Sequence, residues 1–371
     1  MRSWIINRLV HDRELRKILW SVLLVGSFIG LVSDVHSQKM DANRYAEVYQ
    51  QYLASASPLQ ADDIRHFVFI SRDELRNHLW LKCERLSGAQ ILYPWRTLEK
   101  SRGVYDFSKI HDDLDYLENH GKQLFIQLQD TTFNPQQPAV PDYLRTPEFN
   151  GGDFAKQNEN GIPSGWVAQR WNPKVRDRFA LLLEALGKEF DGRIEGINLP
   201  ETAVEGLDHH QDPSFSPELY AQAIQANMAA MKQAFPRSVT VQYANFMPGE
   251  WLPWNDRGYL RSIFAYGQEI GVGLGGPDLM VRRKAQLNHA LALMHENTFT
   301  VPLAIAVQRG NYIGMTGADL DPGRQMPQDS SPGSSQVPML HAFAKDFLKV
   351  RYLFWQNEEP YFTRDVLPML R

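Results

Sequence analysis

The feature that most constrains the fold is a regular alternation of short apolar runs with longer amphipathic segments after about residue 65. The runs have the length and the Val, Ile and Leu content of buried strands, and the segments between them place apolar residues at helical spacing. This alternation predicts βα units and a parallel sheet. The eight predicted strands are residues 66–70, 89–93, 123–128, 194–199, 239–244, 271–274, 301–307 and 351–355. Eight such strands with helices between them predict a single closed (β/α)₈ TIM barrel of the α/β class.

The intervening segments predict helices, and one of them carries the single cysteine. The clearest predicted helices are residues 106–121, 174–190, 217–235, 282–296 and 336–350. A further helix is predicted over residues 72–86, with Cys83 packed in the core; one cysteine excludes an intrachain disulfide. The Gly-, Pro- and Ser-rich stretch 321–335 is typical of a loop after the seventh strand. Residues 65–371 are therefore expected to form one barrel domain.

The N-terminus has the pattern of a targeting segment. Basic residues precede an apolar run at residues 18–32, and small residues follow at a cleavage-like position near Ser37. We therefore predict a signal peptide at residues 1–37, an N-terminal extension at 38–64, and export to the periplasm or the extracellular space. The run is shorter than the roughly 20 residues of a spanning helix but long for a signal core, so an uncleaved membrane anchor is the alternative.

Charge and motif content exclude several classes of function. Net charge is only -4, with 39 basic and 43 acidic residues, so the chain lacks the basic footprint of a nucleic-acid-binding protein. A neutral, sugar-like ligand fits this balance better. No phosphate-binding glycine motif, serine nucleophile elbow or zinc-type cysteine set is present, and we expect no cofactor. His209 and His210 lie between Asp208 and Asp212, but a solvated loop explains them better than a metal site, and no metal is expected.

The fourth predicted strand ends in residues suited to catalysis. The run 194–199 is followed by Pro200 and Glu201, which places a carboxylate at the C-terminal tip of a barrel strand, where barrel enzymes hold catalytic acids. The seventh predicted strand ends instead in Gln308, an amide that can neither carry a proton nor attack as a carboxylate does. The sequence thus favours a glycosidase and also raises a question about its second catalytic group.

A motif around the second strand carries a family resemblance. Residues 93–107 read Tyr-Pro-Trp-Arg-Thr-Leu-Glu-Lys-Ser-Arg-Gly-Val-Tyr-Asp-Phe. This stretch resembles the W-x-x-L-E-x-x-x-G-x-Y-D-F signature of barrel glycoside hydrolases whose two catalytic glutamates lie on strands four and seven. An Asp-rich helix and the third strand follow, and Trp171-Asn172-Pro173, a helix and the fourth strand extend the likeness. The resemblance covers the chain in order from about Arg65 to its end.

The resemblance implies roles for particular residues. Glu201 matches the general acid/base, which protonates the leaving oxygen and then activates water. Asn198 matches the sugar-binding asparagine of that family, although it stands three residues before the carboxylate rather than next to it. Gln308 occupies the place of the nucleophile, and Trp355 matches the tryptophan that forms the floor of the sugar site.

A second carboxylate must come from another strand end. Retaining glycosidases hold the two carboxyl groups about 5–5.5 Å apart and inverting ones about 6.5–9.5 Å apart. Asp278 after the sixth strand is the preferred candidate, because Gly275 and Gly276 let the backbone pass close to a ligand, although they also suit an ordinary turn. Glu358 or Glu359 after the eighth strand, and Glu205, are alternatives, but Glu358 and Glu359 can equally begin the last helix.

The remaining candidates are polar and aromatic groups at predicted strand ends, which suit hydroxyl-rich ligands and can stack on a sugar ring. The predicted substrate-binding residues are Trp95, Arg96, Asp130, Asn198, Tyr243, Asn245, Gln308, Tyr312 and Trp355. The long segment 129–171 after the third strand is expected to fold as a lid over the barrel mouth or as a structural flap.

Two functions follow from these observations. The first is an exported glycoside hydrolase that cleaves O-glycosyl bonds in a polysaccharide or oligosaccharide, with Glu201 as general acid/base. The second is a catalytically inactive barrel that binds glycans, in which Gln308 marks the loss of the nucleophile. Both have a carbohydrate as partner, and contact with a membrane is expected only through an uncleaved N-terminal anchor.

Overall fold

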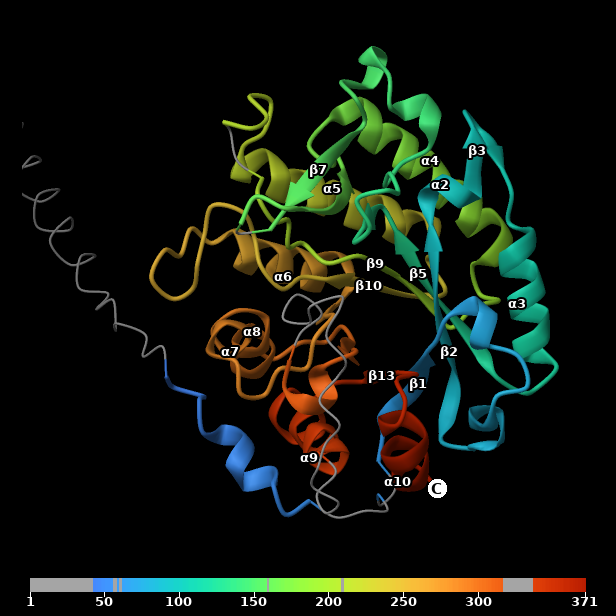
Figure 1. The fold of residues 1–371 in the computed structure, drawn as a ribbon, viewed down its shortest axis with the longest axis vertical. Helices are drawn as coiled ribbons and strands as arrows, with labels where there is room; N and C mark the ends of the chain where they lie inside the picture. The colour runs from blue at the N-terminus through green and yellow to red at the C-terminus, as the bar shows by residue number, and fades with distance from the viewer. Residues whose placement is uncertain (1–42, 56–58, 60–61, 159, 208–209, 316–335) are drawn as a thin grey trace, which may run out of the picture. The chain divides into compact units, whose positions relative to one another are not determined.

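The computed structural model describes residues 43–55, 59, 62–158, 160–207, 210–315 and 336–371, and these contain a closed eight-stranded parallel barrel (Figure 1). Around the barrel the strands follow the order β1-β13-β12-β11-β10-β9-β5-β2. Their bounds are β1 (Arg65–Phe69), β2 (Leu86–Pro94), β5 (Gln123–Gln129), β9 (Gly196–Leu199), β10 (Val239–Tyr243), β11 (Gly273–Gly276), β12 (Leu303–Val307) and β13 (Tyr352–Gln356). All eight predicted strands are confirmed, and the (β/α)₈ barrel is the fold.

The barrel interior is a packed aromatic core. Pairing of β1 with β13 closes the barrel and places Phe67 opposite Phe354. Phe125 packs edge-on against Phe354, with ring centroids 4.9 Å apart, and Tyr352 joins the same cluster. Because successive side chains on a strand point to opposite faces, the residues between these ones face outward and pack against the helices.

Most predicted helices are present on the outside of the barrel (Figure 1). They are α3 (Ser108–Glu118), α4 (Pro173–Phe190), α5 (Pro217–Ala234), α7 (Lys284–Asn288), α8 (Ala290–Glu296) and α9 (Val337–Ala342), the last continued by η8 (Phe343–Phe347). The predicted helix 282–296 is broken at His289, whose φ of -104° and ψ of -115° are not helical. The structure adds α6 (Tyr259–Ile270), which the sequence analysis missed, and a short C-terminal α10 (Leu367–Met369).

The helix predicted over residues 72–86 is wrong. This segment forms two short 3₁₀ turns, η2 (Arg72–Glu74) and η3 (Leu79–Lys82), separated by Asn77 in a left-handed conformation with φ of 58°. A left-handed residue cannot continue an α-helix, so the chain turns there. Cys83 is nevertheless buried, as expected, and its Sγ lies 3.7 Å from the carbonyl oxygen of Leu370.

The signature-like stretch after β2 forms a small buried framework. The chain runs through α2 (Trp95–Leu98) into a hairpin of β3 (Glu99–Ser101) and β4 (Val104–Tyr105). The Glu99 side chain is fully buried and accepts hydrogen bonds from Trp95 Nε1 (2.8 Å), the Gly103 amide (2.8 Å) and the Tyr143 hydroxyl (2.9 Å). It also forms an ion pair with Arg178. The motif therefore stabilises the strand-to-helix connection, and Trp95 is buried rather than placed at the barrel mouth.

The segment after β5 folds into a three-stranded antiparallel sheet, which we call the lid sheet. It consists of β6 (Thr131–Thr132), β8 (Pro163–Ala168) and β7 (Asp153–Gln157), with β8 in the middle. The segment between β6 and β7 contains two 3₁₀ turns, η4 (Asp142–Leu144) and η5 (Pro147–Phe149).

The described part of the N-terminal extension packs on the barrel. It contains η1 (Val48–Tyr52), and just before it the Tyr45 hydroxyl donates a hydrogen bond of 2.7 Å to Glu296 at the end of α8. The predicted signal peptide or anchor lies outside the described residues. Within the described residues, no helix combines the length and apolar character needed to cross a membrane.

The buried Glu99 gives a test of this framework. We expect Glu99→Ala to lower the free energy of unfolding by about 3–5 kcal/mol, because it leaves the Arg178 guanidinium without its ion-pair partner. Urea denaturation would measure the change. Glu184→Ala is the matched control, since Glu184 forms only an exposed pair with Lys188 on α4, and it should change stability by less than about 0.5 kcal/mol. Equal effects of the two variants would contradict a structural role for Glu99.

Candidate active site

Glu201 follows β9, and its carboxylate is held by Asn245, which follows β10. Asn245 Nδ2 donates a hydrogen bond of 2.5 Å to Glu201 Oε2. Asn245 Oδ1 in turn accepts from the backbone amides of Ala203 (3.1 Å) and Phe246 (2.9 Å). Because the oxygen of this amide is occupied by two backbone donors, its NH₂ group must point at Glu201. Glu201 was predicted to be catalytic and Asn245 to bind substrate, and the structure brings their side chains into contact.

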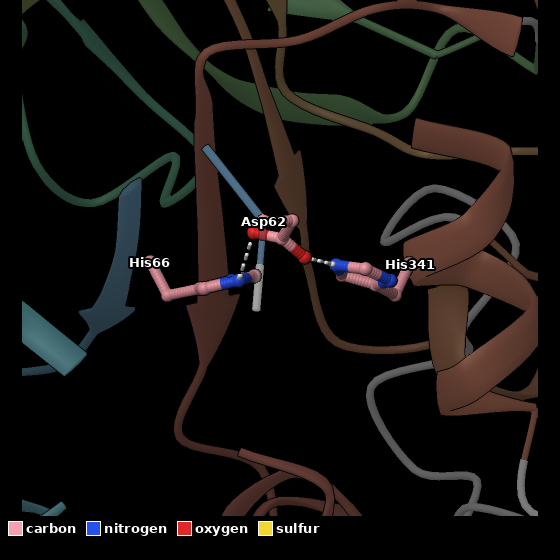
Figure 2. Close-up of side chains that lie close together, drawn as sticks. All are labelled: Asp62, His66 and His341. Atoms are coloured by element: carbon pink, nitrogen blue, oxygen red, sulfur yellow. Dashed lines mark ion pairs between the residues drawn. The ribbon is translucent and has the colours of Figure 1, made fainter. Parts of the chain in front are cut away.

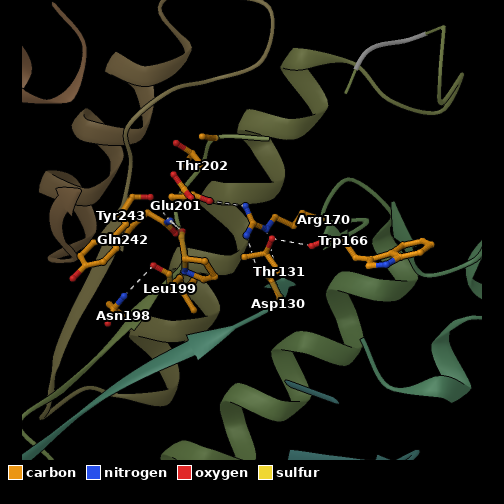
Figure 3. A network of polar contacts seen from close by, with 12 residues as sticks. Asp130, Thr131, Trp166, Arg170, Asn198, Leu199, Glu201, Thr202, Gln242 and Tyr243 are labelled. Atoms are coloured by element: carbon orange, nitrogen blue, oxygen red, sulfur yellow. Dashed lines mark hydrogen bonds and ion pairs between the residues drawn. The ribbon is translucent and has the colours of Figure 1, made fainter. Parts of the chain in front are cut away.

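The backbone around Glu201 is fixed by side chains from several elements (Figure 3). Gln242 Nε2 donates to the carbonyl of Pro200 (2.7 Å), and Arg170 Nη1 donates to the carbonyl of Glu201 (3.0 Å). The Thr202 hydroxyl donates to the carbonyl of Phe246 (2.7 Å). These bonds tie the segment after β9 to β10 and to the end of the lid segment, so the Glu201 side chain projects from a rigid base.

Asp130 belongs to this supporting network. Arg170 Nε and Nη2 donate to the two Asp130 oxygens at 2.8 and 2.6 Å, and both side chains are almost fully buried. Arg170 also donates to the Tyr220 hydroxyl (2.7 Å), which donates to the carbonyl of Thr202 (3.0 Å). Asp130 was predicted to bind substrate, but the structure places it beneath the site, where its ion pair with Arg170 positions Glu201.

The surroundings of Glu201 raise the pKa of its carboxyl to about 7. Removal of the carboxylate from water is the main cause, and the negative charge of Asp278 adds to it. The Asn245 hydrogen bond and the positive charges of Lys156 and Arg170 act in the opposite direction. A carboxyl with a pKa near neutrality can both donate and accept a proton, as a general acid/base requires.

Asp278 shares this region with Glu201. It follows β11, and its Oδ1 accepts a hydrogen bond of 3.0 Å from Asn311 Nδ2. Asp278 and Asn245, the partner of Glu201, line one small cavity together with Phe246 and Ile305. A second carboxylate therefore lies within electrostatic reach of the first, from the strand end that the sequence analysis preferred.

Glu358 lies in a different charged group. It follows β13 and forms an ion pair with Arg309, with 3.4 Å between Arg309 Nε and Glu358 Oε1. Burial raises the pKa of Glu358, the positive charge of Arg309 opposes this, and the negative charges of Glu74 and Glu359 add to it. Its charged neighbours are thus residues after β1, β12 and β13, and β13 itself stands across the barrel from β9.

Lys156 is a site residue that the sequence analysis missed. It lies on β7 of the lid sheet, is only 4% exposed, and has its Nζ 3.8 Å from the centre of the Phe133 ring. Burial lowers the pKa of Lys156 to about 8, although the negative charges of Glu201 and Glu205 oppose the shift. Ser164 on β8 donates to Glu205 (3.3 Å), which holds the lid sheet close to the segment after Glu201. The segment that contains Lys156 was predicted as a long loop, and nothing in its sequence indicated that this lysine lies near Glu201.

Two tryptophans of one loop are exposed to solvent. Trp251 and Trp254, in the loop between β10 and α6, are 47% and 71% exposed. Trp251 stacks on Phe246, with ring centroids 5.5 Å apart and an angle of 11° between the planes. Backbone hydrogen bonds of 2.9 and 2.8 Å between Trp251 and Asn255 close this loop. The loop therefore presents a rigid aromatic surface next to Asn245.

Several predicted substrate-binding residues are buried. Asn198 accepts a hydrogen bond of 2.9 Å from Gln90 inside the barrel, and the Tyr243 hydroxyl accepts one of 3.0 Å from the same amide. Trp355 is fully buried on the outward face of β13, where its Nε1 donates to His66 Nδ1 at 3.1 Å. The neighbouring Phe354 points into the barrel, so Trp355 points out by the alternation of the strand.

The other predicted residues are placed as follows. Tyr312 is buried, donates to the carbonyl of Gln356 (2.8 Å) and stacks on Tyr361. Arg96 is partly exposed and donates to Gln137 (3.1 Å). Gln308 follows β12 and continues the alternation in which Ala304 and Ala306 face the barrel interior. Its backbone amide donates a hydrogen bond of 2.7 Å to Asn311 Oδ1. Gln308 therefore stands at the mouth, whereas Tyr312 contributes to packing beneath it.

The described residues include one cluster with metal-ligand chemistry, formed by Asp62, His66 and His341 (Figure 2). Asp62 lies 2.8 Å from His341 Nε2 and 3.8 Å from His66 Nε2. The Trp355 indole donates to His66 Nδ1, so in neutral His66 the proton must sit on Nε2, the atom that would face a metal. A metal bound at Nε2 would displace this proton. The ring would then be an imidazolate, or the proton would sit on Nδ1 and face the indole N–H of Trp355. The donor set therefore does not fit a metal, and it connects β1 to α9 instead.

Comparison with known proteins supports the fold. No protein-family model matches the sequence, and no curated protein matches it. The catalytic domain of β-amylase from Paenibacillus polymyxa aligns with a TM-score of 0.53 at 8% identity, over 81% of this chain and 93% of that chain. Endo-glycoceramidase II from Rhodococcus sp. aligns with a TM-score of 0.47 at 11% identity, over 82% and 76%. A GH5_18 protein from Bifidobacterium longum aligns with a TM-score of 0.47 at 11% identity, over 80% and 70%. The β-amylase alignment agrees with the closed (β/α)₈ barrel of this chain, the fold that the signature-like stretch predicted.

The charge of Lys156 gives a test of the site. We expect Lys156→Met to raise the pKa of Glu201 above about 7, because it removes a positive charge that favours the carboxylate. A carbon-13 NMR titration of the glutamate carboxyls would measure this, with Glu201→Gln identifying the resonance. Lys188→Met, at an exposed lysine on α4, is the control and should leave the Glu201 titration unchanged. An unchanged midpoint in Lys156→Met would show that the lid lysine does not act on Glu201.

Proposed function

We propose that this protein is an exported glycoside hydrolase in which Glu201 is the general acid/base and Asp278 is the second carboxylate. The observation that carries the proposal is the raised pKa of Glu201, about 7, at a barrel strand end with a second carboxylate acting on it. Glycoside hydrolysis needs two carboxyl groups whose environments separate their roles, one able to hold a proton and one ionised. Asp278 takes the ionised role that Gln308 cannot fill.

The mechanism follows from these positions. Protonated Glu201 would donate its proton to the leaving glycosidic oxygen, which breaks the bond to the anomeric carbon and leaves Glu201 as a carboxylate. If the reaction retains configuration, Asp278 would attack the anomeric carbon as that bond breaks, and a water deprotonated by the Glu201 carboxylate would then cleave the glycosyl–Asp278 ester and leave Glu201 protonated again. If it inverts configuration, Asp278 would instead remove a proton from the water that attacks the anomeric carbon. Asn245 holds the Glu201 carboxyl in place during both steps. Lys156 would stabilise the Glu201 carboxylate once the proton has left.

Features of the mouth support a carbohydrate as substrate. Trp251 and Trp254, in the loop that follows β10, are exposed, and exposed aromatic faces stack on the C–H surface of sugar rings. Asn245 and Gln308 supply amide groups at the strand ends, which can donate to and accept from hydroxyls. Together these groups favour a neutral polyhydroxylated ligand over a charged one.

An inactive glycan-binding barrel is the second candidate, and the amide of Gln308 at the end of β12 is the observation that favours it. In that case the mouth would bind oligosaccharides without cleaving them, and the charge on Asp278 would have no chemical role. Glu201→Gln and Asp278→Asn would then leave the only measurable property, glycan binding, nearly unchanged.

Activity measurements on a panel of 4-nitrophenyl glycosides test the hydrolase. We expect Glu201→Gln and Asp278→Asn each to lower kcat/KM by about 10²–10⁴-fold, as removal of a positioned acid or base does. Glu189→Gln, an exposed glutamate on α4, is the control and should retain wild-type activity. Activity that survives in Asp278→Asn would remove Asp278 from the mechanism, and cleavage of no member of the panel would favour the glycan-binding alternative.

The pH dependence of the same reaction provides a further check. Glu201 must be protonated to act as the acid, so kcat/KM should fall as the pH rises through about 7, the pKa of Glu201 in the folded protein. The activity should therefore be retained on the acidic side of this value. A rate that rises through pH 7 would assign Glu201 the role of a base in the free enzyme instead.

Export is part of the proposal and rests on the basic and apolar pattern of residues 1–37. We expect the full chain, expressed in a Gram-negative host, to appear in the periplasmic fraction, and its N-terminal sequence to begin near residue 38. A mature protein that keeps residues 1–37 and sediments with membranes would support the uncleaved anchor. A protein that stays in the cytoplasm would contradict export.

A further inference from the structure

Asn311 is a buried asparagine that the proposed mechanism does not use. It begins η6 (Asn311–Ile313), the short 3₁₀ turn that follows β12, and its exposed fraction is only 1%. The chain reaches it through Gly310, whose φ of 90° lies in the left-handed region that favours glycine. The turn after Gln308 is therefore tight, and it buries a polar amide close to the tip of β12.

The oxygen of the Asn311 side chain is occupied by backbone donors. Asn311 Oδ1 accepts hydrogen bonds from the backbone amides of Gln308 (2.7 Å) and Leu279 (3.3 Å). The backbone amide of Asn311 donates in turn to the carbonyl of Gln308 (2.9 Å). Both the side chain and the backbone of Asn311 are thus tied to the residue that follows β12.

The NH₂ group of the same side chain faces acceptors. Asn311 Nδ2 donates to Asp278 Oδ1 (3.0 Å) and to the carbonyl of Met315 (2.9 Å), and it lies 3.4 Å from Met280 Sδ. A flipped amide would place its oxygen against a carboxylate and a carbonyl, and its NH₂ group against two N–H donors. The surroundings therefore determine the orientation of the amide, and an N–H of Asn311 must point at Asp278.

Asn311 holds the Asp278 segment at two points. One contact is to the carboxylate of Asp278, and the other is to the backbone amide of Leu279, the next residue. Because one contact is to the side chain and the other to the backbone beside it, the pair restricts rotation of the Asp278 side chain. Asp278 itself is partly exposed and lines the small cavity that it shares with Asn245.

The same arrangement holds Glu201. Glu201 follows β9 and accepts from Asn245 after the neighbouring strand β10, and Asp278 follows β11 and accepts from Asn311 after the neighbouring strand β12. Both asparagines are buried, and the Oδ1 atom of each accepts from two backbone amides. A fixed N–H donor orients a carboxylate and favours its ionised form, which is the form that the proposed role of Asp278 requires.

We propose that Asn311 is a positioning residue of the reaction, which orients the Asp278 carboxylate at the barrel mouth and stabilises its ionised form. The end of β12 thus contributes to the site through the asparagine of its turn, although Gln308 supplies no carboxylate. A misplacement of a reacting group by about 1 Å can cost about 10²-fold in rate, so this orientation matters for catalysis. The inference rests on the proposed function, in which Asp278 is the second carboxylate.

A double-mutant cycle with Asp278 tests this role. Serine is too short to reach Asp278 but keeps a small polar residue in the turn, so we expect Asn311→Ser to lower kcat about 10- to 100-fold and to leave KM within about twofold. The substrate is the 4-nitrophenyl glycoside that the wild-type protein cleaves fastest. In the Asp278→Asn background, Asn311→Ser should change kcat/KM by less than about twofold, because the carboxylate that it positions is already gone. Equal losses in the two backgrounds would mean a purely structural role and would overturn the inference.

Two further variants separate positioning from packing. Asn311→Leu has nearly the size of asparagine, so it fills the space without donating to Asp278, and it should lose as much kcat as Asn311→Ser. Asn297→Ser is the control, because Asn297 donates to the carbonyl of Leu293 (2.8 Å) at the end of α8, and it should keep the kcat of its background. The Tm of each variant is measured alongside, and losses of kcat that simply follow the losses of Tm would contradict positioning.

The outcomes distinguish this inference from the proposed function. If the wild-type protein cleaves a glycoside and Asn311→Ser cleaves it at the same rate, Asn311 does not position Asp278 and the hydrolase stands. If the wild-type protein cleaves none, the hydrolase is wrong, and crystal structures of the wild type and Asn311→Ser decide the inference. An Asp278 side chain that turns away in the variant would support the positioning contact, and an unchanged side-chain conformation would overturn it.

Discussion

The buried ion pair between Arg170 and Asp130 is the interaction on which the site depends. Asp130 comes directly after β5 and Arg170 comes just before α4, so the pair closes the long lid segment at its base. The remaining donors of Arg170 reach the carbonyl of Glu201 and the Tyr220 hydroxyl on α5. The Arg170 guanidinium thus joins the end of β5, the end of the lid segment and the residues after β9. Loss of either charge would leave the other buried without a partner, at a cost of about 3–5 kcal/mol.

This rigid base lets Glu201 occupy an unfavourable environment. A carboxylate removed from water and placed near the charge of Asp278 would be expected to turn away or to stay permanently protonated. The Asn245 hydrogen bond and the charge of Lys156 offset part of that penalty, and the resulting pKa of about 7 leaves both protonation states accessible. In the proposed mechanism, the cost of burying the Glu201 carboxylate is what allows this group to act as both acid and base.

The signature-like stretch after β2 stabilises the scaffold, although Trp95 and Arg96 within it were predicted to bind substrate. Its glutamate, Glu99, collects donors from Trp95, Gly103, Tyr143 and Arg178, and so organises the connection between β2 and α3. Trp95 is buried with its indole N–H donating a hydrogen bond to the Glu99 carboxylate. A motif can therefore identify a fold correctly and still mark residues that build the scaffold, since the connection must be stable wherever the barrel is used.

The sequence by itself determined the barrel, because the alternation of strand-length apolar runs with amphipathic helices depends on local spacing. It also located Glu201, Gln308 and Asp278 at strand ends, since those positions follow directly from where each run stops. The face on which a side chain lies was decided only by the tertiary structure, because a shift of one residue reverses it: Phe354 points into the barrel and Trp355 points out. The partners of Glu201 were also decided there. Asn245 follows β10, Arg170 lies at the end of the lid segment, and Lys156 lies on β7. No local pattern records contacts between segments so far apart in the chain.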